Sequence, residues 1–161
     1  MVITREQIWT LLSTVKDPEI PVLNVVEMGI VRAVRHLPEG WEVDITPTYS
    51  GCPAMDTIEA DIKHAFRTAK IPVIVKTVLA PAWTTDWLTE AAKQKLESVG
   101  IAPPVGASMD KRTLFDAEIV VRCPLCKSED TRKVSQFGST ACKALYQCNT
   151  CQEPFDYFKC L

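Results

Sequence analysis

The sequence predicts an α+β protein in two parts: a small N-terminal α/β domain with three strands in a mixed sheet and helices, and a C-terminal module organised by four cysteines. Two observations predict this division. Residues 1–102 alternate between helical and strand-like apolar patterns. Residues 119–161 hold short β-rich pieces around paired cysteines, too few to bury a core unaided. Residues 103–118 carry prolines and a glycine without apolar periodicity, so we interpret them as a linker.

Composition restricts the class of protein. Of 161 residues, 47% are apolar, which excludes general disorder. The sequence has no apolar run of membrane-spanning length and no signal-peptide pattern, so we expect a cytoplasmic protein with no membrane partner. Residues 1–118 carry 12 basic and 16 acidic residues, net −4, whereas residues 119–161 carry 6 and 4, net +2. Nucleic acid is therefore not expected as a partner.

The first element is a helix that begins at a capping box. Thr4 is the expected cap and Gln7 reaches back to it. The helix is expected to end near Lys16, because Asp17 precedes Pro18. The apolar stripe consists of Ile8, Leu11, Leu12 and Val15.

Three strands and a second helix follow. Residues 30–37 and 41–46 alternate like strands around a short Pro-Glu-Gly loop, which predicts a hairpin. Residues 54–69 have helical apolar spacing, and the β-branched run 73–79 predicts a third strand, buried on at least one face. A strand, a helix and a strand in succession favour a right-handed βαβ crossover, hence a mixed sheet.

A third helix is expected to begin at Thr85 or Asp86 and to run to about Ser98. Trp83 and Trp87 precede or open it, four residues apart. Both could be buried in the core, or they could form part of an aromatic surface that binds a partner. We favour burial in the core.

Cys52 lies on the turn between the second predicted strand and the helix that follows. A helix N-terminus favours a thiolate, so Cys52 is the candidate functional thiol. The alternative is a small buried apolar residue. His36 and His64 are not placed to act as its base, which argues against a Cys-His nucleophile.

The C-terminal part contains Cys123-Pro-Leu-Cys126 and Cys148-Asn-Thr-Cys151, with 21 residues between the pairs. Two such pairs can surround one ion tetrahedrally, so this spacing is typical of a zinc ribbon. Zinc is the expected metal; iron or an iron–sulfur cluster at the same four cysteines is the alternative. Cys142 and Cys160 are left over, as buried residues or additional ligands.

Two sets of motifs resemble known families. Residues 17–31 and 46–55 resemble the iron–sulfur cluster assembly domain, also called domain of unknown function 59. Residues 81–87, 121–126 and 136–161 resemble the D proteins of bacterial phenylacetate-degradation clusters. Cys52 matches the characteristic cysteine of the first family. Ala80 stands where an acidic residue is expected in such proteins, so no ligand is expected there.

The resemblance implies an accessory or maturation factor for the multicomponent oxygenase that epoxidises the ring of phenylacetyl-CoA. It would assist iron or iron–sulfur centre assembly in the oxygenase or its reductase during aerobic phenylacetate degradation. Its expected partners are those oxygenase and reductase subunits, or other iron–sulfur assembly proteins. Homodimer formation is left open.

The motifs themselves indicate a non-catalytic protein. A diiron carboxylate site needs two Glu-x-x-His motifs, and the sequence offers one partial match, Asp61 to His64. Glycine-rich nucleotide loops are absent from the sequence. Two competing hypotheses remain: a zinc-ribbon nucleic-acid-binding or regulatory protein, and a thiol enzyme that uses Cys52.

Overall fold

The computed structural model describes residues 3–105 and 119–159. The chain forms two compact units that divide between Trp83 and Thr84. This division differs from the domain boundary expected at residue 102, and part of the linker expected over 103–118 lies outside the described residues.

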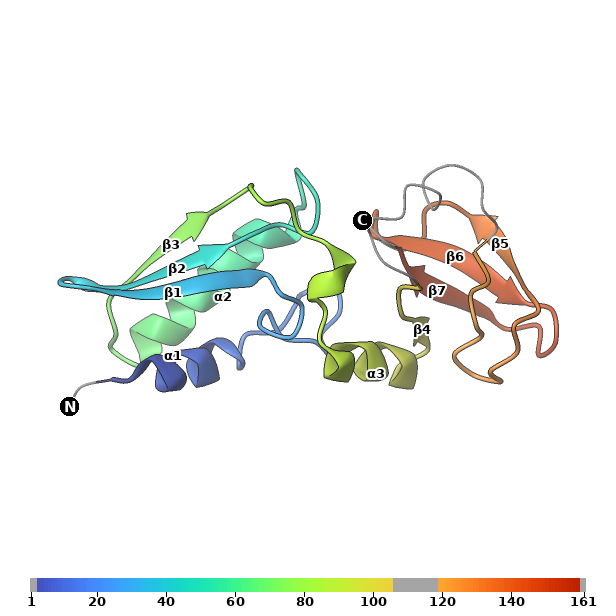
Figure 1. The fold of residues 1–161 in the computed structure, drawn as a ribbon, viewed down its shortest axis with the longest axis horizontal. Coiled ribbons are helices and arrows are strands. Elements are labelled where there is room, and N and C mark those ends of the chain that lie inside the picture. The colour runs from blue at the N-terminus through green and yellow to red at the C-terminus, as the bar shows by residue number, and fades with distance from the viewer. Residues whose placement is uncertain (1–2, 106–118, 160–161) are drawn as a thin grey trace. The chain divides into compact units, whose positions relative to one another are not determined.

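The first unit is a three-stranded mixed sheet with two helices (Figure 1). In chain order its elements are α1 (Arg5–Leu12), β1 (Val31–Leu37), β2 (Gly40–Ile45), α2 (Ala54–Thr68) and β3 (Val73–Thr77). The sheet order is β1-β2-β3, with β1 antiparallel and β3 parallel to β2. The expected hairpin, crossover and mixed sheet are all confirmed.

Helix α1 begins as its sequence predicts and ends earlier. Thr4 and Gln7 form the reciprocal capping box. The last helical residue is Leu12, and Ser13 serves as the C-cap, so the helix stops before reaching Asp17-Pro18. The Asp17 carboxylate then accepts hydrogen bonds from the backbone N–H groups of Glu19 and Ile20, both at 2.8 Å, and so shapes the loop that follows.

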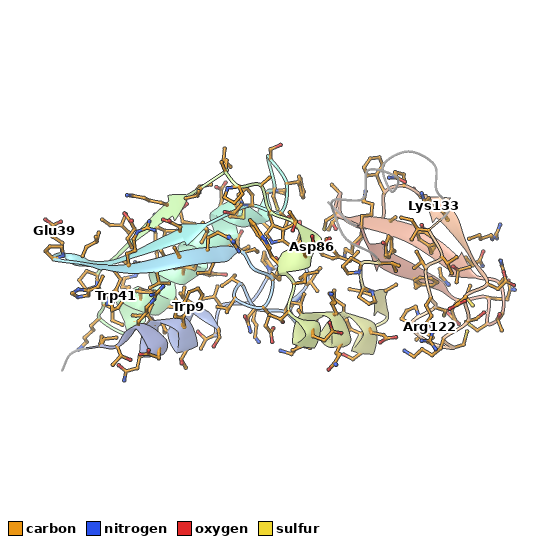
Figure 2. The ribbon with its side chains drawn as sticks, in the orientation of Figure 1. Trp9, Glu39, Trp41, Asp86, Arg122 and Lys133 are labelled. Carbon is orange, nitrogen blue, oxygen red and sulfur yellow. The ribbon has the colours of Figure 1, made fainter. Side chains whose placement is uncertain are left out.

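The core of the first unit forms between the helices and one face of the sheet. The apolar stripe of α2 is buried as predicted, through Ile58, Ile62 and Phe66. From β2, the alternate residues Trp41, Val43 and Ile45 are also buried; Figure 2 labels Trp41. Strand β3 departs from the expectation, because it lies at the edge of the sheet and none of its residues is fully buried.

Two acidic residues, Glu42 and Asp44, lie on β2. Glu42 and Asp44 alternate with the core residues and are only 6% and 8% exposed. The Arg35 guanidinium on β1 donates to Glu42 Oε1 at 2.7 Å and to Asp44 Oδ2 at 2.6 Å. Lys76 on β3 pairs with the second oxygen of Glu42. The three strands are therefore joined by ion pairs as well as by backbone hydrogen bonds.

The second unit holds one helix and a four-stranded sheet. Its elements are the 3-10 turn η1 (Thr85–Trp87), α3 (Glu90–Ser98), β4 (Ile101–Ala102), β5 (Thr131–Ser135), β6 (Lys143–Cys148) and β7 (Pro154–Phe158). The sheet order is β4-β7-β6-β5, and only the β4–β7 pair is parallel. Because β4 is part of this sheet and Ala102 part of its core, the chain up to residue 102 divides between the units.

Helix α3 starts later than expected. Neither Thr85 nor Asp86 caps it; both belong to η1. Thr89 is the N-cap, and its hydroxyl accepts a hydrogen bond from the N–H of Ala92 at 3.1 Å. Of the two tryptophans, Trp83 is a core residue at 4% exposure, as predicted, whereas Trp87 is half-buried.

No helix within residues 3–105 or 119–159 combines the length and the apolar character that crossing a lipid bilayer requires.

Candidate metal centre

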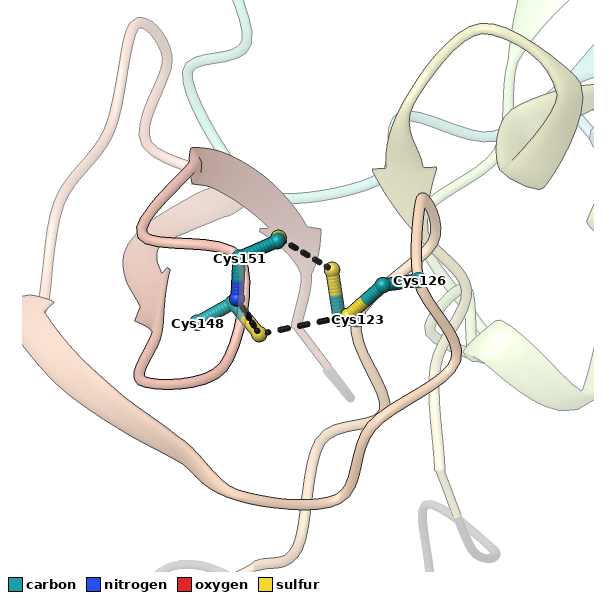
Figure 3. Close-up of side chains that lie close together, drawn as sticks. All are labelled: Cys123, Cys126, Cys148 and Cys151. Atoms are coloured by element: carbon teal, nitrogen blue, oxygen red, sulfur yellow. Dashed lines mark hydrogen bonds between the residues drawn. The ribbon is translucent and has the colours of Figure 1, made fainter.

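The paired cysteines lie on two tight turns of the second unit (Figure 3). The first turn closes where the N–H of Lys127 donates to the carbonyl of Cys123 at 3.0 Å. In the second, the N–H of Cys148 donates to the carbonyl of Glu153 at 3.0 Å. Lys127 and Gln152 directly follow the second cysteine of each turn and both have a φ of 65°. This left-handed backbone reverses the chain and leaves the sulfurs of each turn on one side.

The two turns bring four sulfur atoms together. Sγ of Cys123 lies 3.8 Å from Sγ of Cys151, and Sγ of Cys126 lies 3.5 Å from Sγ of Cys148. All four sulfurs lie within 4.8 Å of one another. A tetrahedral zinc ion with Zn–S bonds of about 2.3 Å requires sulfur–sulfur distances of about 3.8 Å. These separations fit that donor set and far exceed the roughly 2.05 Å of a disulfide.

The cluster is electrostatically suited to a cation. The backbone N–H of Cys151 donates to Sγ of Cys148 at 3.5 Å and lowers the pKa of the Cys148 thiol to about 6. A hydrogen bond from the Glu153 N–H lowers the pKa of the Cys151 thiol. Burial and the neighbouring sulfurs outweigh it and raise that pKa to about 12. Four thiolates so close repel one another, so without a metal some must keep their protons. A divalent cation can displace those protons.

The cluster is continuous with the core of its unit. Cys123 and Cys148 are fully buried, Cys151 is half-buried and Cys126 is exposed. Tyr146 stacks on Phe155 at 6.0 Å between ring centres and meets Tyr157 edge-on at 5.5 Å. The other members of this core are Ala102, Val121 and Ala144. Three aromatic residues thus form the core next to the cysteines.

The first cysteine turn is tied to helix α3 by a residue that sequence reasoning missed. Nζ of Lys127 donates to the Pro124 carbonyl at 2.8 Å and pairs with the Glu97 carboxylate on α3 at 2.5 Å. Its place in the sequence, directly after the second cysteine of the turn, was the signal that could have identified Lys127. Both cysteine turns have a residue with left-handed backbone at that place. The partner on α3 had no sequence signal.

Cys52 lies on the expected turn, just before Pro53, the N-cap of α2. Its side chain is half-buried, and the Thr48 hydroxyl is its polar neighbour, with Oγ1 3.9 Å from Sγ. Its backbone carbonyl accepts from the N–H of Met55 at 3.2 Å. The residue is thus held at the start of the helix and is only half-buried. A functional role for Cys52 stays a prediction.

A groove of about 540 Å³ runs between the end of α1 and the side of α2 in the first unit. Its lining includes Asp17, from the loop after α1, and Asp61 and His64, three residues apart on α2. Among residues 3–105 and 119–159, however, the four cysteines Cys123, Cys126, Cys148 and Cys151 are the one group of three or more potential ligands close enough to share an ion. The partial Asp61–His64 motif is therefore not assembled into such a group.

Comparisons with known proteins match both units. Residues 5–78 match the family model of an iron-sulfur cluster assembly protein, and residues 107–159 match that of the PaaD zinc beta ribbon domain. The chain is 51% identical over 156 residues to the D component of a "Putative 1,2-phenylacetyl-CoA epoxidase" in Escherichia coli. That alignment covers 96% of this chain and 92% of the relative. The chain belongs to the PaaD family.

Other relatives of this PaaD family member resemble its first part. An "Fe-S protein maturation auxiliary factor" of Porphyromonas gingivalis is 38% identical over 96 residues, covering 58% of this chain and 90% of the relative. A crystal structure of a DUF59 domain from Bacillus anthracis superposes with a TM-score of 0.53 at 26% identity, covering 56% and 89% of the two chains. A conserved hypothetical protein of Thermotoga maritima superposes with a TM-score of 0.50 at 26% identity, covering 58% of this chain and 94% of the other. The expected DUF59-like fold and zinc ribbon are thus confirmed.

Proposed function

We propose that this protein is a non-catalytic accessory and maturation factor for the multicomponent phenylacetyl-CoA epoxidase, acting in the cytoplasm. It would help to assemble the iron or iron–sulfur centres of the oxygenase or of its reductase. The observation that carries the proposal is the similarity to an epoxidase component along nearly the whole chain, through both units. The similarity of the first part to an Fe-S protein maturation auxiliary factor supports the assembly role.

The four-cysteine cluster is proposed as a structural zinc site formed by Cys123, Cys126, Cys148 and Cys151. Its sulfur–sulfur distances support tetrahedral coordination, and the core of the second unit packs directly around it. Bound zinc would supply folding energy that this small core lacks. Iron or an iron–sulfur cluster at the same cysteines is the alternative, because four thiolates suit either.

Cys52 is proposed as the thiol that contacts the client's iron or cluster in transit. Its support is its position on a strand-to-helix turn and a residue that is only half-buried. The iron is cargo in this role, and the protein holds it only during transfer. The side chain of Thr48 would orient the thiol through its contact with Sγ.

The proposed clients are the oxygenase and reductase subunits, with other iron–sulfur assembly proteins as further partners. A regulatory nucleic-acid-binding role gains no support, because residues 119–161 carry a net charge of only +2. The thiol-enzyme hypothesis also gains none, because the polar neighbour of Cys52 Sγ within the described residues is a hydroxyl rather than a base.

The test is a gene deletion in a phenylacetate-degrading host, complemented with the wild type, Cys52→Ala or Cys142→Ser. Oxygenase and reductase are purified anaerobically from each strain, and their iron content and visible spectra are measured. We expect iron content to fall on deletion, to recover with the wild type and Cys142→Ser, and to stay low with Cys52→Ala. Full metallation and activity of both enzymes in the deletion strain would refute the maturation role.

A further inference from the structure

An exposed aromatic residue lies just after β5, which is the edge strand of the second unit's sheet among the described residues. Phe137 is 65% exposed. Two lysines accompany it: Lys133 on β5, labelled in Figure 2, and Lys159 just after β7. We call these three residues, Lys133, Phe137 and Lys159, the Phe137 patch. An exposed apolar residue grouped with polar neighbours is typical of protein interaction sites.

The patch is held in a defined arrangement. Nζ of Lys159 lies 4.4 Å from the centre of the Phe137 ring and donates to the carbonyl of Gln136 at 2.9 Å. The backbone N–H of Lys159 donates to the carbonyl of Cys142 at 3.0 Å. The ammonium group is thereby fixed over the ring, so little ordering of these side chains remains to be lost on binding.

The two lysines gather positive charge without a matching carboxylate. Burial lowers the pKa of Lys159, and the nearby charge of Lys133 acts in the same direction, against an opposing effect of Cys142. Within residues 3–105 and 119–159, no ion pair joins either lysine to an acidic side chain. Two neighbouring cations beside an apolar ring are complementary to a surface that offers carboxylates and an apolar side chain.

The backbone of this edge is less suited to binding. Strand β5 pairs with β6 on one side, and its register shifts between Lys133 and Ser135. Irregularities and charged residues on an edge strand discourage the addition of another strand. This argues against edge-to-edge pairing of two copies of the chain and favours a contact made by side chains.

We propose that the Phe137 patch is the surface by which this protein docks on an acidic surface of one of the epoxidase subunits. Phe137 is the aromatic anchor, and Lys133 and Lys159 pair with carboxylates of the client. The proposal rests on the proposed function for the identity of the client. It adds the surface and the chemistry by which the client is recognised.

The test measures binding of the full-length, zinc-loaded chain to each purified oxygenase and reductase subunit by biolayer interferometry, over a range of salt concentrations. Phe137→Ala is compared with Leu79→Ala, an equally exposed apolar residue (65%) of the first unit. Lys133→Glu is compared with Arg132→Glu, its neighbour on β5, which instead contacts Gln147 on β6. All variants are first matched to the wild type in zinc content and melting temperature.

We expect Phe137→Ala to weaken binding to one subunit by about tenfold or more, as removal of a central aromatic anchor does. Lys133→Glu should weaken it several-fold and flatten its salt dependence, and the two control variants should bind as the wild type. Equal binding by all variants, equal weakening by the controls, or no binding of any subunit by the wild type would each overturn the proposal. If iron content still falls on gene deletion, the proposed function survives that result.

Two other ligands are tested in parallel. If Phe137→Ala abolishes binding of a labelled single-stranded RNA or DNA oligonucleotide but leaves subunit binding intact, the patch is a nucleic-acid surface and the proposal fails. If it instead abolishes self-association in light scattering, the patch is a contact between copies, and the proposal fails equally.

Discussion

The indole N–H of Trp83 donates a hydrogen bond to the backbone carbonyl of Met28, 2.8 Å away and 55 residues earlier in the chain. Trp83 is 4% exposed and Met28 is 2% exposed, so the bond is shielded from water. Met28 precedes Gly29, whose φ of 69° turns the chain toward β1. This contact fastens the last residue of the first unit to the turn that leads into its sheet.

Replacing Trp83 with Phe should lower the free energy of unfolding of the first unit by about 1–3 kcal/mol. The buried Met28 carbonyl would lose its donor, and a smaller ring would fill the site. The measurement is urea unfolding followed by circular dichroism. Trp9→Phe is the control, since Trp9 is only half-buried, and we expect it to change stability by less than about 0.5 kcal/mol. Equal losses in the two variants would contradict this role of the hydrogen bond.

Replacing Cys148 with Ser should abolish metal binding and the fixed tertiary structure of the second unit. Cys148 is fully buried, is part of both the sulfur cluster and the surrounding core, and ends strand β6. The measurements are metal content by mass spectrometry and near-ultraviolet circular dichroism. Cys142→Ser is the matched control, because Cys142 is also buried but lies outside the cluster. A Cys148→Ser protein with full metal occupancy would show that the site is assigned to the wrong ligands.

The stability of the first unit should fall in acid because of Glu42. Its ion pairs with Lys76 and then Arg35 lower the pKa of Glu42 below its ordinary value of 4.5. The unfolded chain therefore binds the proton more readily. The stabilisation is complete above about pH 4.5 and is lost as the pH falls through the folded-state pKa. Melting temperatures of the wild type and Glu42→Gln should differ near neutral pH and converge in acid; a difference that persists at all pH values would exclude this cause.

The hairpin between β1 and β2 depends on Gly40. Its φ is 141°, and an added Cβ would lie 2.5 Å from the carbonyl oxygen of Pro72. Gly40→Ala should therefore cost about 2 kcal/mol or more in unfolding free energy. Gly100→Ala is the control, because Gly100 has a φ of 80° and open space around its Cα, so only backbone strain of about 1 kcal/mol is added. A smaller loss for Gly40→Ala than for Gly100→Ala would contradict the predicted clash.

Much of the first unit was predictable because its signals are local. The capping box at Thr4, the alternation in β2 and the apolar stripe of α2 each determine one element without reference to the rest of the chain. The four-cysteine cluster was equally predictable, since two short turns with fixed spacing are enough to define it. What these patterns do not contain is the identity of the metal.

The remaining features depend on contacts between distant residues. Strand β4 has two residues, too few for any periodicity, and exists because Ile101 and Ala102 pair with Asp156 and Tyr157. Strand β7 begins at Pro154, a residue that usually indicates a break in a strand pattern. The exposure of Phe137 was likewise hidden, because other aromatic residues of the same unit, such as Tyr146, are buried. These are consequences of the assembled sheet rather than of any one segment.

Strand β4 also determines how the ribbon can be isolated for study. It pairs with Asp156 and Tyr157 in the middle of β7, whose other side pairs with β6, so within the described residues the central part of β7 has a strand on both sides. A fragment that begins at residue 119 would lack β4 and would present the backbone of the apolar strand Pro154–Phe158 to other molecules. Such an edge invites intermolecular pairing and aggregation. Fragments that begin at Thr84, and so retain α3 and β4, should give the soluble ribbon that a shorter fragment would not.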